Sequence, residues 1–83
     1  MDMFLQETIG TERFLRPRIK TMHYVCVLFA DGTVDYLDVQ GDLSPRRDDA
    51  LEYDDIEEAE LDCAILEARN FNASVETFQR FYQ

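Results

Sequence analysis

The sequence is poor in the residues that most often carry catalytic chemistry. It has one histidine, two cysteines and no tryptophan. A nucleophilic serine or cysteine needs a base within hydrogen-bonding reach, and structural zinc sites need clusters of cysteine and histidine. The single histidine, His23, stands at the start of an apolar stretch, where we expect a partly exposed structural role. The sequence therefore predicts no enzyme: no catalytic residue, no cofactor and no metal ligand.

Glycine is also scarce, which argues against a phosphate-binding loop. The three glycines are scattered and form none of the glycine-rich motifs that hold nucleotide phosphates. Asp31, Thr33 and Asp35 have the spacing of the first ligands in an EF-hand calcium loop. Tyr36, however, stands where that loop needs glycine, so calcium is not expected.

Long apolar runs are absent as well. The longest, Tyr24–Ala30, is too short to cross a bilayer, and Met1–Phe14 has neither the basic start nor the apolar centre of a secretory signal. Cys26 and Cys63 belong to no metal or redox motif, so we expect buried thiols and no bridge between them. These features favour a cytoplasmic protein.

Positive charge is scarce too. Eight Lys and Arg residues stand against 18 Asp and Glu, which gives a net charge of −10. Residues 1–20 hold four bases and three acids, whereas residues 21–83 hold four bases and fifteen acids. Such a field repels nucleic acid and anionic membranes and speeds encounter with basic proteins. We therefore expect a basic protein partner, with no membrane contact and no direct nucleic-acid contact.

The chain is apolar enough, at 46%, to form one small core, so residues 1–83 are predicted to be a single domain. Its clearest signal is a hairpin of residues 18–30 and 33–39 around Asp31-Gly32, a pair typical of a two-residue type I′ turn. Because the first run is apolar on both faces, we expect it to be covered on both sides, by neighbours or by a second subunit. The predicted pairs are Phe29–Val34, Leu28–Asp35, Val27–Tyr36, Cys26–Leu37, Val25–Asp38 and Tyr24–Val39.

A helix is predicted after a loop at residues 41–47. Apolar residues recur at helical spacing over residues 54–69, and Asp54 and Glu57 have the spacing of a capping box. Residues 74–82 favour a short C-terminal helix, with a further strand of the sheet as the alternative. Residues 1–16 are expected to form an edge strand or a short helix. The predicted fold class is α+β, with a small antiparallel sheet packed on one main helix.

The stretch from Asp48 to Asp62 holds nine carboxylates and no Lys or Arg. The helix dipole favours acids in a first turn, but like-charge pairs such as Glu58 and Asp62 cost about 0.2–0.5 kcal/mol each. We interpret the stretch as a surface that receives a cationic partner, and a solvated helix face remains the alternative. The candidate partner-binding residues are Asp48, Asp49, Glu52, Asp54, Asp55, Glu57, Glu58, Glu60 and Asp62, with Asp35, Asp38 and Asp42 as a secondary set.

A small chain with an Asp-Gly hairpin (Val25–Val39), an acidic helix (Asp54–Arg69) and no catalytic residues resembles the phage-encoded inhibitors of host defence, including anti-CRISPR proteins. The resemblance is one of class and composition over the whole chain. It implies a viral protein that inhibits a nucleic-acid-binding protein or complex, such as a CRISPR effector subunit. Some inhibitors of that class mimic DNA. The resemblance assigns no residue.

A homodimeric structural or assembly module without inhibitory activity is the second hypothesis. The basic segment Arg13–Lys20 either balances the chain's own carboxylates, or touches phosphate or an acidic subunit, or pairs with the acidic face of a second copy. The contacts of such a dimer would be aromatic residues of the hairpin and the tail: Tyr24, Tyr36, Phe78, Phe81 and Tyr82.

Overall fold

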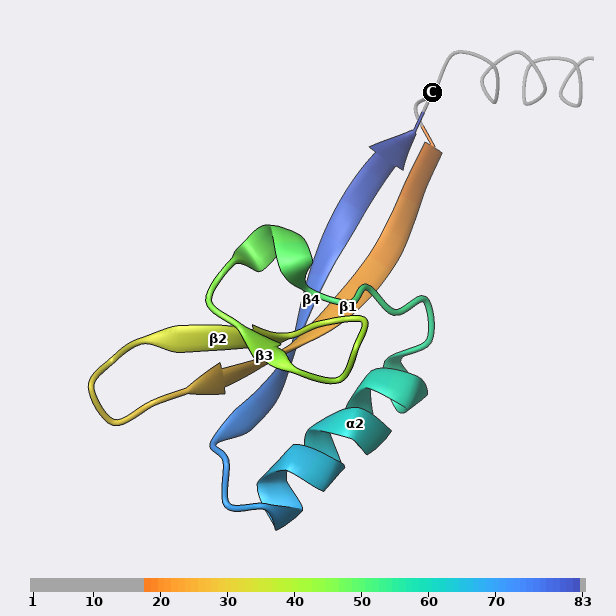
Figure 1. Ribbon diagram of the computed structural model, residues 1–83. Helices are drawn as coiled ribbons and strands as arrows, with labels where there is room; N and C mark the ends of the chain where they lie inside the picture. Colours follow the sequence, from red (N-terminus) through yellow and green to blue (C-terminus); the bar gives the residue numbers. More distant parts are fainter. Residues whose placement is uncertain (1–17, 83) are drawn as a thin grey trace, which may run out of the picture.

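Residues 18–82, which the computed structural model describes, form a four-stranded antiparallel sheet with one α-helix packed against it (Figure 1). The strand order is β3-β2-β1-β4, so the first strand in sequence is internal and the last lies at an edge. This confirms the predicted α+β class, whereas the prediction for residues 1–16 lies outside the described residues. The elements are β1 (Arg18–Leu28), β2 (Val34–Leu37), β3 (Leu43–Ser44), the 3-10 helix η1 (Arg47–Asp49), α2 (Ile56–Ala68) and β4 (Ala73–Tyr82).

The hairpin of β1 and β2 turns over three residues, so the predicted two-residue type I′ turn is wrong. The Phe29 amide donates to the Thr33 carbonyl and the Gly32 amide donates to the Phe29 carbonyl, each over 2.9 Å. A type I′ turn needs positive φ at two residues, but within this turn only Gly32 has one, at 89°. The Asp31 carboxylate accepts from the Thr33 hydroxyl (2.7 Å) and amide (3.0 Å), which stabilises the turn and lowers the pKa of Asp31.

The three-residue turn shifts the strand register by one position. Cys26 pairs with Tyr36 rather than with Leu37, and the other predicted pairs shift in the same way. A one-residue shift moves side chains to the opposite face of a sheet. Tyr36 therefore lies beside Tyr24, with ring centroids 5.7 Å apart. The predicted loop at 41–47 also contains β3, which pairs with β2, and the first residue of η1.

Residues 73–82 form a strand, so the preference for a C-terminal helix is wrong and the strand alternative is the observed structure. β4 pairs with β1 along its whole length, from Ala73 opposite Val27 to Tyr82 opposite Arg18. β1 offers backbone N–H and C=O groups at both edges, and β4 satisfies those at the edge opposite β2. This long ladder, together with the β-branched and aromatic residues of the tail, outweighs the local helical spacing.

The ends of α2 are set by local contacts. Asp55, rather than the predicted Asp54, is the N-cap, and its carboxylate accepts a hydrogen bond from a first-turn amide over 2.9 Å. At the other end, Asn70 adopts a positive φ of 70° and the Phe71 amide donates to the Leu66 carbonyl over 3.1 Å. A left-handed residue after the last turn is a common helix stop. It turns the chain back toward the sheet as β4.

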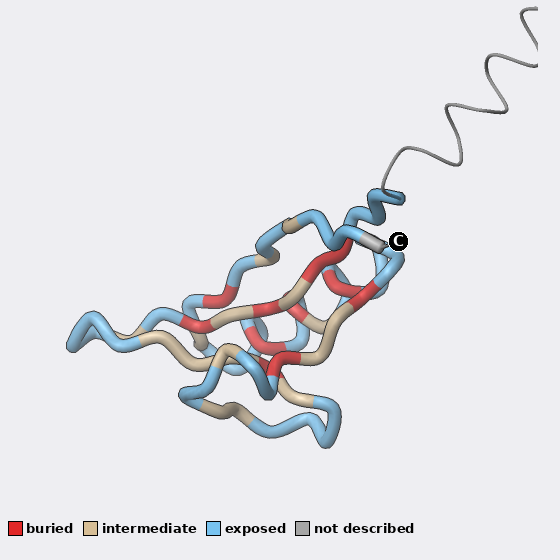
Figure 2. The backbone as a smooth tube through the Cα atoms, turned by 90° about the horizontal axis from the view of Figure 1, so that it is seen from above, coloured by how far each residue is buried: buried red, intermediate tan, exposed pale blue. Residues whose placement is uncertain are grey.

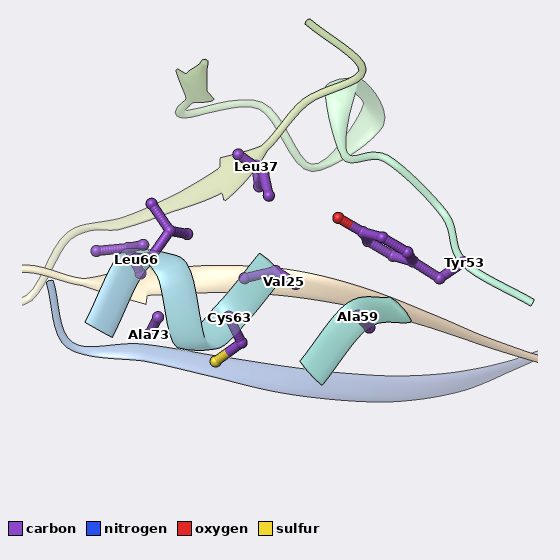
Figure 3. Packing of buried hydrophobic residues seen from close by; sticks show 8 residues of the cluster. Val25, Leu37, Tyr53, Ala59, Cys63, Leu66 and Ala73 are labelled. Atoms are coloured by element: carbon purple, nitrogen blue, oxygen red, sulfur yellow. The ribbon is translucent and has the colours of Figure 1, made fainter. Parts of the chain in front are cut away.

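The main core lies between the sheet and α2 (Figure 3). Val25 and Val27 of β1 are 0% and 1% exposed, and Ala59 of α2 is 0% exposed. The small side chain of Ala59 lets the helix backbone come close to the strands. Figure 2 shows exposed positions at the turns and at the far end of the β1–β4 ribbon. The other members of the cluster are Leu37, Tyr53, Cys63, Leu66 and Ala73.

The opposite face of the sheet carries aromatic rings. The Tyr24 ring centroid lies 5.7 Å from that of Tyr36 and 5.9 Å from that of Phe78. The Arg47 guanidinium of η1 lies over the Tyr24 ring, 3.9 Å from its centroid, in a cation–π contact. The middle of β1 is therefore contacted on both faces, by the core at Val25 and Val27 and by rings at Tyr24, whereas Leu28 is 48% exposed.

Candidate functional site

The acidic stretch does not fold as one helix face. It is divided among η1, an extended segment at residues 50–55, and α2. A surface groove of about 710 Å³ lies between the extended segment and α2. Its acidic lining comes from both elements and consists of Glu52, Asp54, Asp55, Glu58 and Asp62, and its other lining residues are Met22, Leu51, Tyr53 and Leu61. We call this feature the acidic groove.

The extended segment is held in place by the sheet. Tyr53 and His23 exchange two backbone hydrogen bonds of 2.8 and 2.9 Å, and the Leu51 amide donates to the Leu37 carbonyl over 2.9 Å. The segment therefore pairs with β1 on the same edge as β2, beyond the point where β2 ends. Because these contacts are backbone bonds, they fix one wall of the acidic groove whatever its side chains are.

A side-chain hydrogen bond joins the two walls of the groove. The Tyr53 hydroxyl donates to the Asp62 carboxylate over 2.5 Å. Tyr53 is only 6% exposed, and burial first, then the carboxylates of Asp62 and Glu58, raise its pKa. The hydroxyl therefore keeps its proton and remains a donor over the ordinary pH range. It holds one oxygen of Asp62 in a defined position beside the groove.

Two cations from distant parts of the chain contact the groove. Lys20 Nζ of β1 lies 2.8 Å from an Asp54 oxygen, and the Arg80 guanidinium of β4 contacts the Glu52 carboxylate. The Lys20–Asp54 pair is about half exposed, at 48% and 63%, so it adds at most about 1 kcal/mol to stability. Both contacts show that the rim of the acidic groove accommodates an ammonium and a guanidinium group.

The remaining predicted residues lie elsewhere. Glu57 is exposed on α2 but does not line the groove, and Glu60 lines a second groove between α2 and β4. Asp48 and Asp49 belong to η1, whose Arg47 covers the aromatic face of the sheet, and Asp49 accepts a 2.6 Å hydrogen bond from Ser44. The structure thus assembles five of the nine predicted carboxylates at one groove.

Of the secondary set of candidate residues, Asp35, Asp38 and Asp42, Asp38 has a structural role. The Asp38 carboxylate accepts hydrogen bonds from the amides of Gln40 and Asp42, each over 2.9 Å, and so shapes the turn between β2 and β3. Asp35 pairs with Val27 across the hairpin. None of these acids lines the acidic groove.

Sequence reasoning missed the apolar part of the groove. Met22, Leu51 and Leu61 come from three different elements, and Leu61 is 67% exposed. Leu61 is one of the apolar residues that recur at helical spacing over residues 54–69, and this spacing predicts that it faces the core. Its exposure could not be predicted from the sequence. The face of α2 that packs against the sheet is narrow and includes the small residues Ala59 and Cys63, so Leu61 lies outside it.

His23 and the thiols have no place in the acidic groove. His23 is buried, at 7% exposed, rather than partly exposed as predicted, and its Nδ1 lies 2.9 Å from the Thr77 hydroxyl oxygen. Both cysteines are free, Cys63 buried and Cys26 half-buried. Burial, followed by the nearby Glu67 carboxylate, raises the pKa of Cys63.

Residues 18–82 contain no group of three or more His, Cys, Asp or Glu side chains arranged to hold a metal ion. Over the same residues, no helix has the length and apolar character needed to span a bilayer. Comparisons of the chain with models of protein families, with curated proteins and with solved structures find no match. Its function is therefore inferred from the geometry and charge of its own residues.

Proposed function

We propose that this chain is a non-catalytic acidic binding protein of the cytoplasm that inhibits a nucleic-acid-binding protein or complex. In this role, the acidic groove receives Lys or Arg side chains that would otherwise hold phosphates. A phage-encoded anti-CRISPR protein that mimics DNA is one form that such an inhibitor takes.

The observation that supports the proposal best is the lining of the acidic groove. Lys and Arg bury their aliphatic stems against apolar surface while the charged head stays among polar groups. Leu51 and Leu61 offer such a surface, and Glu58 supplies a whole carboxylate beyond the two that Lys20 and Arg80 already contact. Asp55 and Asp62 each add one carboxylate oxygen, because the other accepts a hydrogen bond within the chain. A guanidinium pairs with a carboxylate through two parallel hydrogen bonds, as it does with a phosphate.

The net charge of −10 supports the same proposal at longer range. Complementary charge raises the rate at which two proteins meet and repels partners of the wrong sign. A basic phosphate-binding surface would therefore be attracted before contact is made. Because Coulomb attraction between exposed groups is screened over about 8 Å at physiological ionic strength, the binding should weaken markedly at high salt.

The experiment is a competition. The immobilised chain captures proteins at low salt from a lysate of the organism in which it functions, and the captured proteins are eluted at high salt and identified. The affinity of each captured protein for labelled nucleic acid is then measured with and without the free chain. We expect the free chain to displace the nucleic acid.

A matched pair of variants connects the competition to the groove. Glu58 and Glu60 are both exposed on α2, but Glu58 lines the acidic groove and Glu60 does not. Glu58→Lys and Glu60→Lys change the net charge equally, so a difference between them reports position rather than charge. We expect Glu58→Lys to weaken displacement at least about tenfold and Glu60→Lys to leave it close to wild type. Captured proteins that keep their full affinity for nucleic acid in excess chain would contradict the inhibitory role.

A further inference from the structure

We propose that two copies of this chain associate through the outer edge of β4, which forms one continuous antiparallel sheet across a two-fold axis at Phe78. This inference is independent of the proposed function. Among residues 18–82, β4 has a neighbouring strand on one side only, that of β1. An edge strand of this length offers a row of backbone donors and acceptors to another strand.

The hydrogen-bonding pattern shows which residues offer those groups. The Leu28 amide donates to the Asn72 carbonyl over 3.0 Å, at the start of the β1–β4 ladder. Residues in an antiparallel ladder alternate, so the even-numbered residues of β4 direct their backbone groups to β1. Val75, Thr77 and Gln79 therefore direct their N–H and C=O groups outward.

The sequence of β4 is self-complementary in one register. With Phe78 opposite Phe78 of the second copy, Thr77 stands opposite Gln79, so that both residues of the pair have outward backbone groups. The same register places Glu76 opposite Arg80, twice by symmetry. Opposite charges directly across a ladder stabilise it, whereas registers centred on Glu76 or Arg80 place like charges opposite each other.

The register also covers apolar surface that is exposed in the single chain. Phe81 is 63% exposed, and in this register it stands opposite Val75 of the second copy. Val75 lines the second groove, about 430 Å³ in volume, together with Ile56 of α2, which is 44% exposed. In the dimer, the Phe81 ring of each copy would thus pack against apolar side chains beside α2 of the other copy. Figure 1 shows that the β1–β4 ribbon that carries Phe81 extends beyond α2.

The existing contacts of the paired residues are compatible with this arrangement. Glu76 is exposed on β4, and Arg80 contacts Glu52 within the chain. A guanidinium has five N–H donors, so Arg80 can contact Glu52 and Glu76 of the second copy together. The Tyr24 and Phe78 rings already pack with Arg47, and the Tyr36 ring packs with Tyr24, so the edge rather than the aromatic face forms the seam.

Sedimentation of the full chain over about two decades of concentration, at moderate salt to screen the net charge, tests the proposal. We expect a monomer–dimer equilibrium. Glu76→Arg places arginines opposite each other at both symmetric positions and should weaken self-association at least about tenfold. Asp42→Arg makes the same charge change in the turn between β2 and β3, and it should leave the equilibrium close to wild type.

Mixing two variants tests the register itself. Chains with Glu76→Arg carry two bases at these positions, and chains with Arg80→Glu carry two acids, so each alone should be monomeric. An equimolar mixture should form a heterodimer, because each acid then stands opposite a base. Circular dichroism confirms that both variants are folded before they are mixed.

Three results would overturn the proposal. The wild-type chain could stay monomeric over the whole range. Glu76→Arg could dimerise as well as wild type, which would exclude this register. The two variants could fail to associate when mixed although both are folded.

Discussion

The Tyr53 hydroxyl and the Asp62 carboxylate, 2.5 Å apart, join the extended segment before α2 to the middle of the helix. Both residues line the acidic groove, where five of the predicted partner-binding acids lie. It also separates structural from available carboxylates, because Asp62 is used within the chain while Glu58, one turn earlier, has no hydrogen-bond or ion-pair partner among the described residues. Stability and binding can therefore be tested by different substitutions.

Tyr53→Phe should lower the free energy of unfolding by about 1–3 kcal/mol, because it removes a hydrogen bond to a charged group and keeps the ring. Urea unfolding measures the change. Tyr36→Phe is the control, since the Tyr36 hydroxyl has no hydrogen bond to any residue of the described part of the chain and a change within about 0.5 kcal/mol is expected. Equal effects of the two substitutions would show that the Asp62 contact does not contribute to stability.

The same residue predicts a loss of stability in alkali. Burial and the nearby carboxylates raise the pKa of Tyr53 in the folded chain above its ordinary value. Above about pH 10 the unfolded chain loses this proton while the folded chain keeps it, so the unfolded state binds fewer protons and the free energy of unfolding falls as the pH rises.

The measurement is the free energy of unfolding of wild type and Tyr53→Phe between neutral and alkaline pH. The wild-type advantage should be constant up to about pH 10 and should then shrink. An advantage that stays constant or grows above this pH would show that the pKa of Tyr53 is not raised in the folded chain.

The two thiols should differ in reactivity. Only the thiolate is nucleophilic, and the raised pKa of Cys63 and its 6% exposure both lower its rate of alkylation. In mildly alkaline buffer, iodoacetamide should modify Cys26 first, as followed by mass spectrometry of Cys26→Ser and Cys63→Ser chains. In urea the two rates should converge. Faster modification of Cys63 in the folded chain would contradict its burial against the sheet.

Local signals in the sequence predicted the elements that depend on neighbouring residues. Asp31-Gly32 located the hairpin, and helical spacing located α2 to within two residues at its start. The turn length was wrong because the Asp31 contacts to Thr33 favour a turn with one positive φ rather than two. That choice depends on side-chain hydrogen bonds that the Asp-Gly pair alone does not specify.

Contacts between distant residues could not be predicted in the same way. β4 is a strand because β1 has a second edge to fill, a property of the whole sheet. The acidic groove exists because Tyr53 pairs with His23, thirty residues earlier, which separates η1 from α2 and leaves the acids of η1 outside the groove. The ion-pair partners of Glu52 and Asp54 are Arg80 of β4 and Lys20 of β1. Both bases are far from the acidic stretch in the sequence, so its local pattern could not predict these pairs.

The most direct test of the acidic groove is a titration of the isotope-labelled chain with a short oligoarginine peptide at low salt, followed by amide NMR shifts. The largest shifts should fall at residues 52–55, 58 and 62; Glu58→Lys should remove them, and Glu60→Lys should preserve them. Shifts spread evenly over all exposed acids, or the same titration for both variants, would contradict the claim that this groove is built to receive cationic side chains.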